Sequence, residues 1–228
     1  MNLRQGGNNL STESPIISKE LRKYLDKVGY NEPIILRENR EETKNLGAIS
    51  IMQTGAAQGA LISIICRLSN FKNCLEIGTF TGYSSICIAN SISTNSRLTV
   101  IDNNKQYLDI AKKYWDKISI TEKITVMNTN ADEALDKLQS KGKIFDFVFI
   151  DADKSNYVTY FNKVMNIVNA GSLICIDNTL WKGKVYDESN DEKTTKMIRE
   201  LNDTIKKDKR VVHSLLTIYD GMTLCYVK

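Results

Sequence analysis

Five side chains that could do chemistry stand in two short segments, and each segment directly follows an apolar run. They are Asp151, Asp153 and Lys154 in the first segment, and Asp177 and Asn178 in the second. Carboxylates gathered at one place repel one another unless a cation neutralises them. Asp and Asn oxygens are hard ligands and this cluster offers no Cys or His, so the sequence predicts a site for Mg²⁺, Mn²⁺ or Ca²⁺. The alternative is that Asp153 and Asp177 only cap the helices that follow them.

A hard cation with open coordination positions could chelate two neighbouring oxygens of a substrate. It would lower the pKa of a bound hydroxyl and so produce a nucleophile near neutral pH. Lys154 stands three residues after Asp151, close to where that hydroxyl would lie. Near a metal and partly desolvated, Lys154 is expected to have a lowered pKa and to serve as a general base. The alternative is an ordinary surface lysine.

A glycine turn, GTFTG, forms a second group of candidate residues. Gly78 and Gly82 allow a tight turn and a close approach of a ligand to the backbone. Phe80 stands where a dinucleotide fingerprint needs glycine, which argues against NAD or FAD. Glu76 can accept a hydrogen bond from a cationic amino-acid group, and Asp102 can accept both hydroxyls of a ribose. Together they fit S-adenosylmethionine, the alternative being glycines that serve only the turn.

The elements that must position these residues alternate regularly from residue 73 onward. Strands are expected at 74–77, 98–101, 124–127, 145–150 and 173–176, with helices at 84–91, 105–118, 131–139, 157–168 and 192–207. This alternation indicates a doubly wound α/β fold with a mostly parallel sheet, which binds ligands beyond the carboxyl ends of its strands. Val211–Ile218 and Met222–Val227 flank an Asp-Gly turn, so the last strand is expected to be antiparallel.

Three helices are expected before the first strand, from Pro15 to Val28, from Pro33 to Leu46 and from Ala56 to Ser69. Residues 1–14 are expected to be a loose tail. Because no Pro/Gly-rich linker interrupts the rest, residues 15–228 are expected to form a single domain, with helices over 15–70 and an α/β core over 73–228.

Composition excludes several other classes of protein. The 31 basic and 27 acidic residues give a net charge of +4 without a basic stripe, so no nucleic-acid partner is expected. The five cysteines form no CxxC pair, which favours reduced thiols and a cytoplasmic protein. No apolar run approaches the ~20 residues that span a bilayer, so no membrane association is expected. His213, the single histidine, lies in an expected strand and is read as a packed or edge residue.

Taken together, these residues resemble the cation-dependent O-methyltransferases, which include caffeoyl-CoA and catechol O-methyltransferases and belong to the class I S-adenosylmethionine-dependent methyltransferases. The resemblance runs from about Met52 to the C-terminus. Its motifs are MQTGAAQGALI, LEIGTFTGYSS, FVFIDADKSNY, CIDNTLWKGKV and DGMTLC. It implies a Rossmann-like sheet of seven strands with the last strand reversed, a homodimer, and N-terminal helices that shape the acceptor site.

The resemblance also implies roles for individual residues. Metal ligation falls to Asp151, Asp177 and Asn178, and the base to Lys154 beside Asp151. Contacts with S-adenosylmethionine fall to Thr54, Glu76, Gly78, Thr79, Ser84, Asp102, Ala131 and Asp153, and substrate contacts to Met52, Trp181 and Lys182. Two departures from plant members leave the acceptor open: Lys182 replaces an asparagine, and Ala57-Gln58 replaces an acidic pair.

The expected function is therefore metal-dependent methylation of a vicinal aromatic diol such as a catechol or caffeoyl group. A nicotinamide-dependent oxidoreductase on the same layout and a non-catalytic S-adenosylmethionine-binding protein are the alternatives.

Overall fold

The computed structural model describes residues 18–228, so the tail expected at 1–14 lies outside the described residues. The chain divides into two compact units, residues 1–31 and residues 32–228. In the first unit the described structure is helix α1, Lys19–Val28, whose N-terminus is capped by Ser18 accepting a hydrogen bond from the backbone N–H of Leu21 at 3.2 Å. The single domain expected over residues 15–228 stays a prediction.

The second unit contains three helices followed by an alternation of strands and helices. Its elements are α2 (Ile34–Lys44), η1 (Gly47–Met52), α3 (Ala56–Leu68), β1 (Asn73–Ile77), α4 (Tyr83–Ala89), β2 (Arg97–Ile101), α5 (Lys105–Lys117), η2 (Thr121–Lys123), β3 (Ile124–Met127), α6 (Ala131–Ser140), β4 (Phe145–Ile150), η3 (Lys154–Asn156), α7 (Tyr157–Val164), β5 (Val168–Asp177), η4 (Trp181–Tyr186), α8 (Lys193–Lys207), β6 (Val211–Leu216) and β7 (Met222–Val227). The strands form one sheet in the order β3-β2-β1-β4-β5-β7-β6. β7 is antiparallel to both of its neighbours, which confirms the expected fold class and the reversed last strand.

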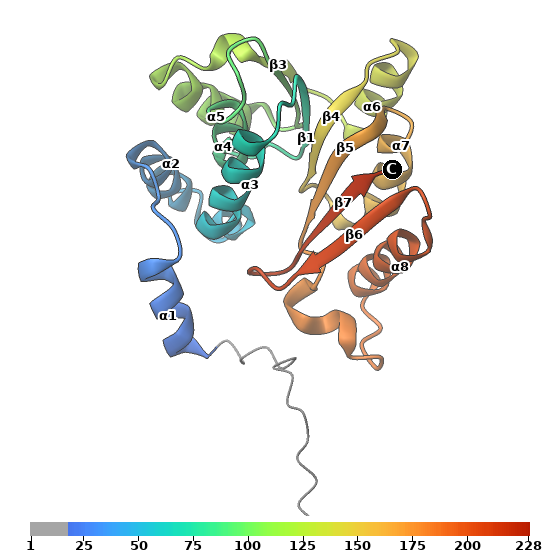
Figure 1. Cartoon of the computed structure of the whole chain (residues 1–228). Helices are drawn as coiled ribbons and strands as arrows, with labels where there is room; N and C mark the ends of the chain where they lie inside the picture. Colours follow the sequence, from blue (N-terminus) through green and yellow to red (C-terminus); the bar gives the residue numbers. More distant parts are fainter. Residues whose placement is uncertain (1–17) are drawn as a thin grey trace, which may run out of the picture. The chain divides into compact units, whose positions relative to one another are not determined.

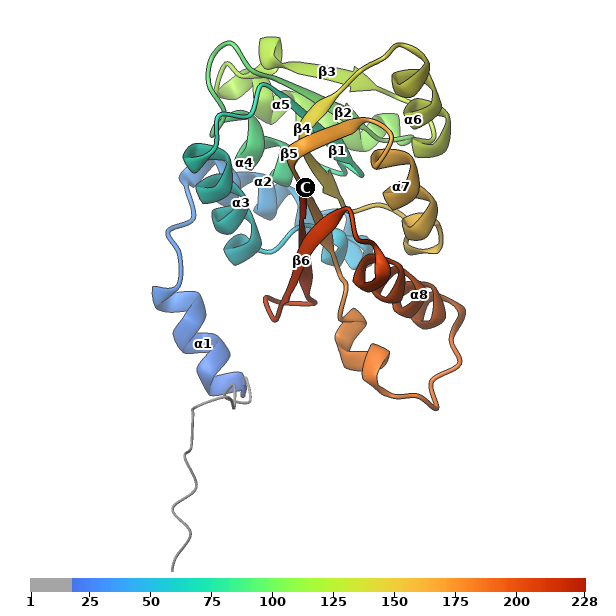
Figure 2. The same ribbon diagram turned by 45° about the vertical axis from the view of Figure 1, so that its right-hand side comes forward.

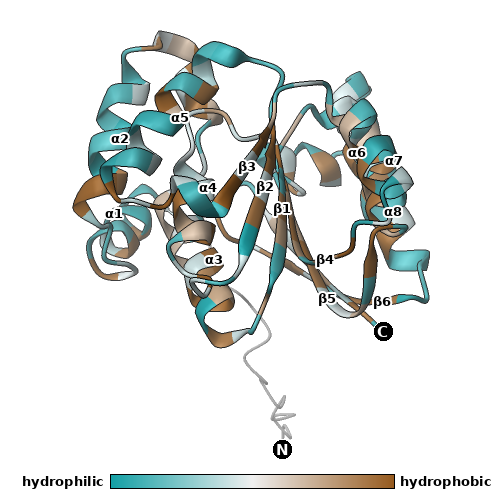
Figure 3. Cartoon of the chain, turned by 90° about the horizontal axis from the view of Figure 1, so that it is seen from above, coloured by the Kyte–Doolittle hydropathy of each residue, from teal (hydrophilic) through white to brown (hydrophobic). Residues whose placement is uncertain are grey.

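Helices cover both faces of this sheet, with α3, α4 and α5 on one side and α6, α7 and α8 on the other (Figure 1). The side chains of β4 alternate between the two cores, as successive residues of a strand must. Phe147 and Phe149 enter the core on the α3–α5 side, while Val148 and Ile150 enter the core on the α6–α8 side. Seen from above, apolar strands lie between helices that turn polar residues outward (Figure 3).

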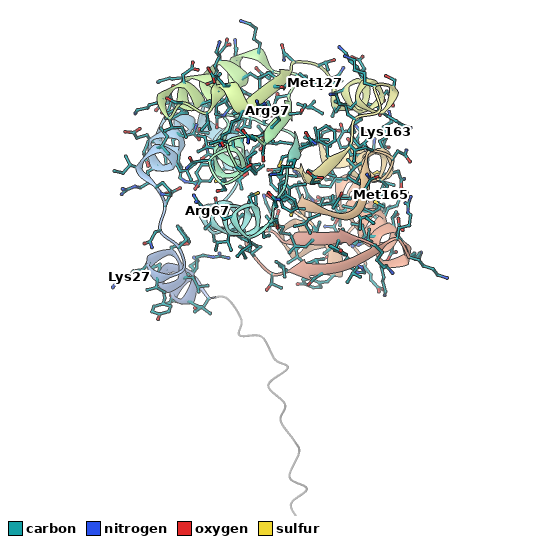
Figure 4. All side chains as sticks on the ribbon, turned by 45° about the horizontal axis from the view of Figure 1, so that its top comes forward. Lys27, Arg67, Arg97, Met127, Lys163 and Met165 are labelled. Atoms are coloured by element: carbon teal, nitrogen blue, oxygen red, sulfur yellow. The ribbon has the colours of Figure 1, made fainter. Side chains whose placement is uncertain are left out.

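Packing rather than surface charge holds these layers together. Lys163 on α7, labelled in Figure 4, lies 2.6 Å from Asp132 and 2.7 Å from Asp136 on α6. Both carboxylates are more than half exposed, so each pair contributes at most about 1 kcal/mol. Leu135 and Leu138 of the same helix are buried, and full burial of one such side chain contributes roughly 1.5–3 kcal/mol.

The start of β5 differs from the sequence prediction. The helix expected to reach Val168 stops earlier, and Val168 pairs instead with Phe145 as the first residue of β5. Near this point Gly171 adopts a left-handed backbone with φ +91°, and the pairing register of β4 with β5 shifts between Phe145 and Phe147. Where the register shifts, the hydroxyl of Ser172 donates a hydrogen bond to the Phe145 carbonyl at 2.9 Å and adds a side-chain contact between the two strands.

One stretch of the described residues, Gly47–Leu68, has the length and the mean hydropathy, 1.4, of a possible membrane span. It is not a continuous helix, because Gln53 and Gly55 have extended backbones between η1 and α3. Ile62 and Cys66 of α3 are buried in the core on that face of the sheet. These contacts make α3 a covering helix of the sheet.

Gly78, directly after β1, is a position where the close approach of two strands excludes a side chain. Its φ is +90°, and an added Cβ would lie 2.0 Å from the carbonyl oxygen of Asp151, a backbone atom that cannot move aside. We expect Gly78→Ala to lower the free energy of unfolding by roughly 3 kcal/mol or more, measured by urea denaturation. Gly171→Ala is the matched control, since its φ is +91° and no atom lies within 4 Å of the added Cβ. Gly171→Ala should lower the free energy of unfolding by roughly 1–2 kcal/mol. Equal decreases in the two variants would contradict the steric argument.

Candidate functional site

The carboxyl ends of β1, β4 and β5 meet at one edge of the sheet. Ile77 lies opposite Ile150, and Ile150 lies opposite Ile176, so the segments that follow these three residues are neighbours. The two groups of residues singled out in the sequence therefore share one site, as a doubly wound sheet predicts.

Asp177, the last residue of β5, is a buried carboxylate with a relative exposure of 2%. Its Oδ1 accepts hydrogen bonds from Gln58 Nε2 at 2.5 Å and from the backbone N–H of Asn178 at 2.6 Å. Burial and the nearby Asp151 carboxylate raise the pKa of Asp177 well above its usual range, although Lys154 and these donors act against the shift. A cation beside Asp177 would favour the ionised form that burial disfavours.

Asp151 and Lys154 form a largely buried ion pair, with Lys154 Nζ 2.8 Å from Asp151 Oδ1 and 3.0 Å from the Ala152 carbonyl oxygen. Burial acts to lower the pKa of Lys154, but Asp151 and Tyr157 outweigh it and the pKa is raised. Without a cation, the groups of the protein itself therefore raise the pKa of Lys154, and the fall expected beside a metal stays a prediction. The lysine is also no ordinary surface residue, because its side chain is only 15% exposed.

Asn178 is held by the turn between β6 and β7. Its φ is +59°, and its Nδ2 donates to Asp220 Oδ2 at 3.4 Å, which leaves the amide oxygen available to a ligand. Asp220 also accepts the backbone N–H of Lys182, and its carbonyl accepts the N–H of Leu180 at 2.9 Å. Figure 2 shows this hairpin, in red, near the orange η4 segment. Sequence reasoning used Asp220 only as a turn residue and missed this contact.

Asp153 does not join the other carboxylates, contrary to the expected cluster of three. Its Oδ1 accepts the hydroxyl of Tyr160 at 2.5 Å, and its Oδ2 accepts Asn156 Nδ2 at 2.5 Å and the hydroxyl of Ser155 at 3.2 Å. Within residues 18–228, no three His, Cys, Asp or Glu side chains gather as a possible metal site. A cation bound by Asp151 and Asp177 could take the amide oxygen of Asn178 as a third protein ligand.

The glycine turn has the conformation that the sequence predicts. Gly78 and Gly82 have φ values of +90° and +85°, and Phe80, at +49°, packs edge-on against Tyr107 with ring centroids 4.7 Å apart. Asp102 Oδ2 accepts the backbone N–H of Phe80 at 2.8 Å, and that of Thr79 at 3.1 Å. Asp102 thus fixes the turn, in addition to the ribose contact expected of it.

Glu76 is fully buried at the end of β1, and neither of its carboxylate oxygens has a hydrogen-bond partner among the described residues. Burial raises its pKa to about 8, although the hydroxyls of Ser84 and Thr79 lie close enough to lower it in part. Thr79 and Ser84 are themselves buried. A buried polar group without a partner requires an explanation, and a ligand that donates hydrogen bonds would supply one.

A buried polar network on α2, which sequence reasoning missed, holds the loop before α3 against the glycine turn. Gln53 Nε2 donates to Asn39 Oδ1 and Thr43 Oγ1, both at 2.9 Å, and to Thr81 Oγ1 at 3.1 Å. Asn39 Nδ2 donates to the Thr81 carbonyl at 2.7 Å. The sequence signal for it was Asn39 and Thr43 one helical turn apart in the helix expected from Pro33 to Leu46.

The remaining predicted residues lie around this edge without forming a tight group. Thr54 is buried in the loop before α3, and its carbonyl accepts a hydrogen bond from Arg40 Nη2 at 3.3 Å. Ala131 is the first residue of α6 and is half-buried. The three expected substrate residues differ in exposure: Met52 ends η1 and is half exposed, Trp181 packs against the α6–α8 core, and Lys182 is exposed. His213 lies exposed on the edge strand β6, as expected.

The unpaired carboxylate of Glu76 predicts a pH-dependent stability. Since its pKa rises from an ordinary 4.5 to about 8 on folding, the folded state loses stability as the pH increases through that interval. Glu76→Gln should remove this loss, so that its melting temperature exceeds that of the wild type by a margin that widens between pH 5 and pH 9. Over the whole interval, the ionisation of Glu76 is expected to lower the free energy of unfolding of the wild type by a few kcal/mol, on the order given by the pKa difference.

Thermal unfolding at pH 5, 7 and 9 without ligands measures this margin. Glu122→Gln, at an exposed position on η2, is the control and should follow the wild-type profile. A margin for Glu76→Gln that does not change with pH would contradict the assignment.

Comparison with known proteins adds independent information. The sequence profile of the family described as O-methyltransferase matches residues 26–228. A caffeoyl-CoA O-methyltransferase of Populus kitakamiensis is 36% identical over 199 residues, covering 83% of this chain and 85% of the relative. Tapetum-specific methyltransferase 1 of Arabidopsis thaliana is 32% identical over 217 residues, covering 91% and 93%.

Solved structures agree with the fold. An O-methyltransferase of Bacillus cereus in complex with SAH is 27% identical, with a TM-score of 0.82, and the match covers 92% of this chain and 97% of that one. The O-methyltransferase TomG of Streptomyces achromogenes, in complex with SAM, has a TM-score of 0.84 at 24% identity, covering 92% and 96%.

Proposed function

Because this chain belongs to the O-methyltransferase family and is an S-adenosylmethionine-dependent enzyme, we propose that it uses a divalent cation to methylate one hydroxyl of a vicinal aromatic diol. The main support for the proposal is that Asp151 follows β4 while Asp177 and Asn178 stand at the end of β5, the strand next to it in the sheet. The oxygen-only donor set favours Mg²⁺, with Mn²⁺ and Ca²⁺ as alternatives.

The three ligand candidates fit a hard cation. Burial and like charge raise the pKa of Asp177, which an added cation would reverse, and the Asn178 amide nitrogen is engaged by Asp220 so that its oxygen is available. A bound cation supplies Lewis acidity, which lowers the pKa of a coordinated hydroxyl.

The residues of the glycine turn would bind the methyl donor. Glu76 would accept hydrogen bonds from the ammonium group of S-adenosylmethionine, Asp102 from the ribose, and Thr54, Thr79, Ser84, Ala131 and Asp153 would line the rest. The unpaired oxygens of Glu76 support this arrangement.

In the proposed reaction a substrate hydroxyl loses its proton and its oxygen attacks the sulfonium methyl carbon, while the carbon–sulfur bond breaks and leaves a thioether. Lys154 would accept the proton as the general base. For this the pKa of Lys154 must fall, which requires a weaker ion pair with Asp151, because Asp151 raises that pKa. Holding acceptor and methyl donor at adjacent strand ends supplies much of the rate.

The acceptor is proposed at the level of a class. Relatives named caffeoyl-CoA O-methyltransferases support a catechol-type ring, for which Met52, Trp181 and Lys182 would provide contacts. Lys182 and Ala57-Gln58 depart from the plant pattern, so a coenzyme A thioester is not part of the proposal.

We also propose a cytoplasmic homodimer that binds neither nucleic acid nor membrane. All five cysteines are free and buried, which supports a reducing compartment. Ile51, Ile64 and Leu68 of η1 and α3 expose more than half of their side chains, which would suit burial against a second copy.

Asp177→Ala should reduce metal-dependent turnover by roughly 100-fold or more while the affinity for S-adenosylmethionine stays nearly unchanged. Turnover of a catechol with Mg²⁺, and calorimetric titration of the methyl donor, measure the two effects. Asp109→Ala on α5 is the control, as Asp109 is exposed and its ion pair within residues 18–228 is with exposed Lys105. Full turnover in EDTA, or in the Asp177 variant, would contradict the metal role.

A methyl-transfer assay across catechols, caffeoyl thioesters and flavonoids, with each metal in turn, tests the acceptor class. Products should appear only from acceptors with two neighbouring hydroxyls. Equal turnover of matched monohydroxyl compounds would contradict the diol, and side-by-side titration with NADH would reveal an oxidoreductase.

A further inference from the structure

Gln58 is a buried side chain of α3 that reaches the proposed metal site. It is 3% exposed, and its Nε2 lies 2.5 Å from Asp177 Oδ1. Its Oε1 accepts the backbone N–H of Gly55 at 2.9 Å, where α3 begins. Since that N–H can only donate, the oxygen of the carboxamide must face Gly55 and the NH₂ must face Asp177. The orientation of the Gln58 amide is therefore determined by its surroundings.

The hydrogen bonds to Asp177 are one-sided. Gln58 Nε2 and the backbone N–H of Asn178 both reach Oδ1, and no hydrogen bond from the described residues reaches Oδ2. One carboxylate oxygen is thus held by two donors, and the other stays available as a single ligand atom.

The other two proposed metal ligands, Asp151 and Asn178, are also engaged by neighbouring side chains. Lys154 Nζ engages Asp151 Oδ1, and Asp220 engages the amide nitrogen of Asn178. Oδ2 is thus the unengaged oxygen of Asp151 and of Asp177, and Asn178 contributes its one amide oxygen. Three single oxygens leave half of an octahedron for substrate and water, whereas Ca²⁺ takes six to eight oxygens and commonly binds carboxylates through both.

We propose that Gln58 is a positioning residue that makes Asp177 a one-oxygen ligand and thereby biases the site toward Mg²⁺ and Mn²⁺ over Ca²⁺. This inference rests on the proposed metal-dependent function. Gln58 touches neither substrate nor methyl donor in it, and acts only through the carboxylate of Asp177. Partners of this kind orient the ligands of metal sites generally, and their loss typically costs 10–100-fold in metal affinity.

Gln58→Met tests the proposal, because methionine has a similar length but cannot donate the hydrogen bond. Mn²⁺ and Ca²⁺ are titrated separately into the full chain by calorimetry, with no methyl donor or acceptor present. We expect the dissociation constant for Mn²⁺ to rise about tenfold or more, and that for Ca²⁺ to change less. Asp177 Oδ1 would then keep only the Asn178 N–H and could also approach Ca²⁺, so the ratio of the two constants is the diagnostic measurement.

The variant also loses the contact that caps α3, so a second variant separates the two effects. Asn104 caps α5 by accepting the backbone N–H groups of Gln106 and Tyr107. Asn104→Ala should lower the melting temperature as cap loss does, but leave the Mn²⁺ to Ca²⁺ ratio within twofold of the wild type. An unchanged ratio in Gln58→Met, or an equal shift in Asn104→Ala, would overturn the role of Gln58.

The failure of this inference can be told from the failure of the proposed function. If Asp177→Ala abolishes Mn²⁺ binding and Gln58→Met keeps the wild-type ratio, only the role of Gln58 is wrong. If the wild type binds no Mn²⁺, or binds it equally well after Asp177→Ala, the metal site is wrong and the inference falls with it.

Discussion

The burial of carboxylates at one edge of the sheet is the constraint on which the rest of this structure depends. Glu76 is fully buried and Asp177 nearly so, at the ends of strands separated only by β4. Burying a charge without full compensation costs several kcal/mol, and both groups respond with a raised pKa. The apolar cores on the two faces of the sheet must offset that cost, and the residues that directly precede Glu76 and Asp177 in their strands are buried.

The parts that hold this edge come from distant regions of the sequence. Gln58 reaches Asp177 across 119 residues, and the turn at Asp220 reaches Asn178 across 42. Gln53 joins α2 to the glycine turn through three hydrogen bonds. Such contacts make the site rigid because each side chain is fixed by at least one partner on another element. The helices before the first strand thus contribute donors here, Asn39 on α2 to the Thr81 carbonyl and Gln58 on α3 to Asp177.

Much of the fold could be predicted from the sequence because the signals are local. Strand and helix periods, the glycines at 78 and 82, and the Asp-Gly turn each act within a few residues. The site was predictable as far as strand ends determine it, which includes Asp151, Asp177 and Asn178. The directions of the side chains could not be predicted. Asp153 points toward Tyr160 on α7 and Lys154 points toward Asp151, and no local sequence pattern encodes these contacts.

The ionisable side chains at this edge of the sheet would act differently on the methyl donor and on the product. Burial, Asp151 and Asp102 all act to raise the pKa of Glu76, while Lys154 acts to lower that of Asp177. An acidic edge of this kind attracts cations, and both the sulfonium donor and a divalent metal are cations. Methyl transfer converts the sulfonium into a neutral thioether, so the product loses one positive charge that the edge favours. We therefore expect the product to gain less than the donor from the carboxylates of this edge, whose ionised forms a bound cation would favour against burial.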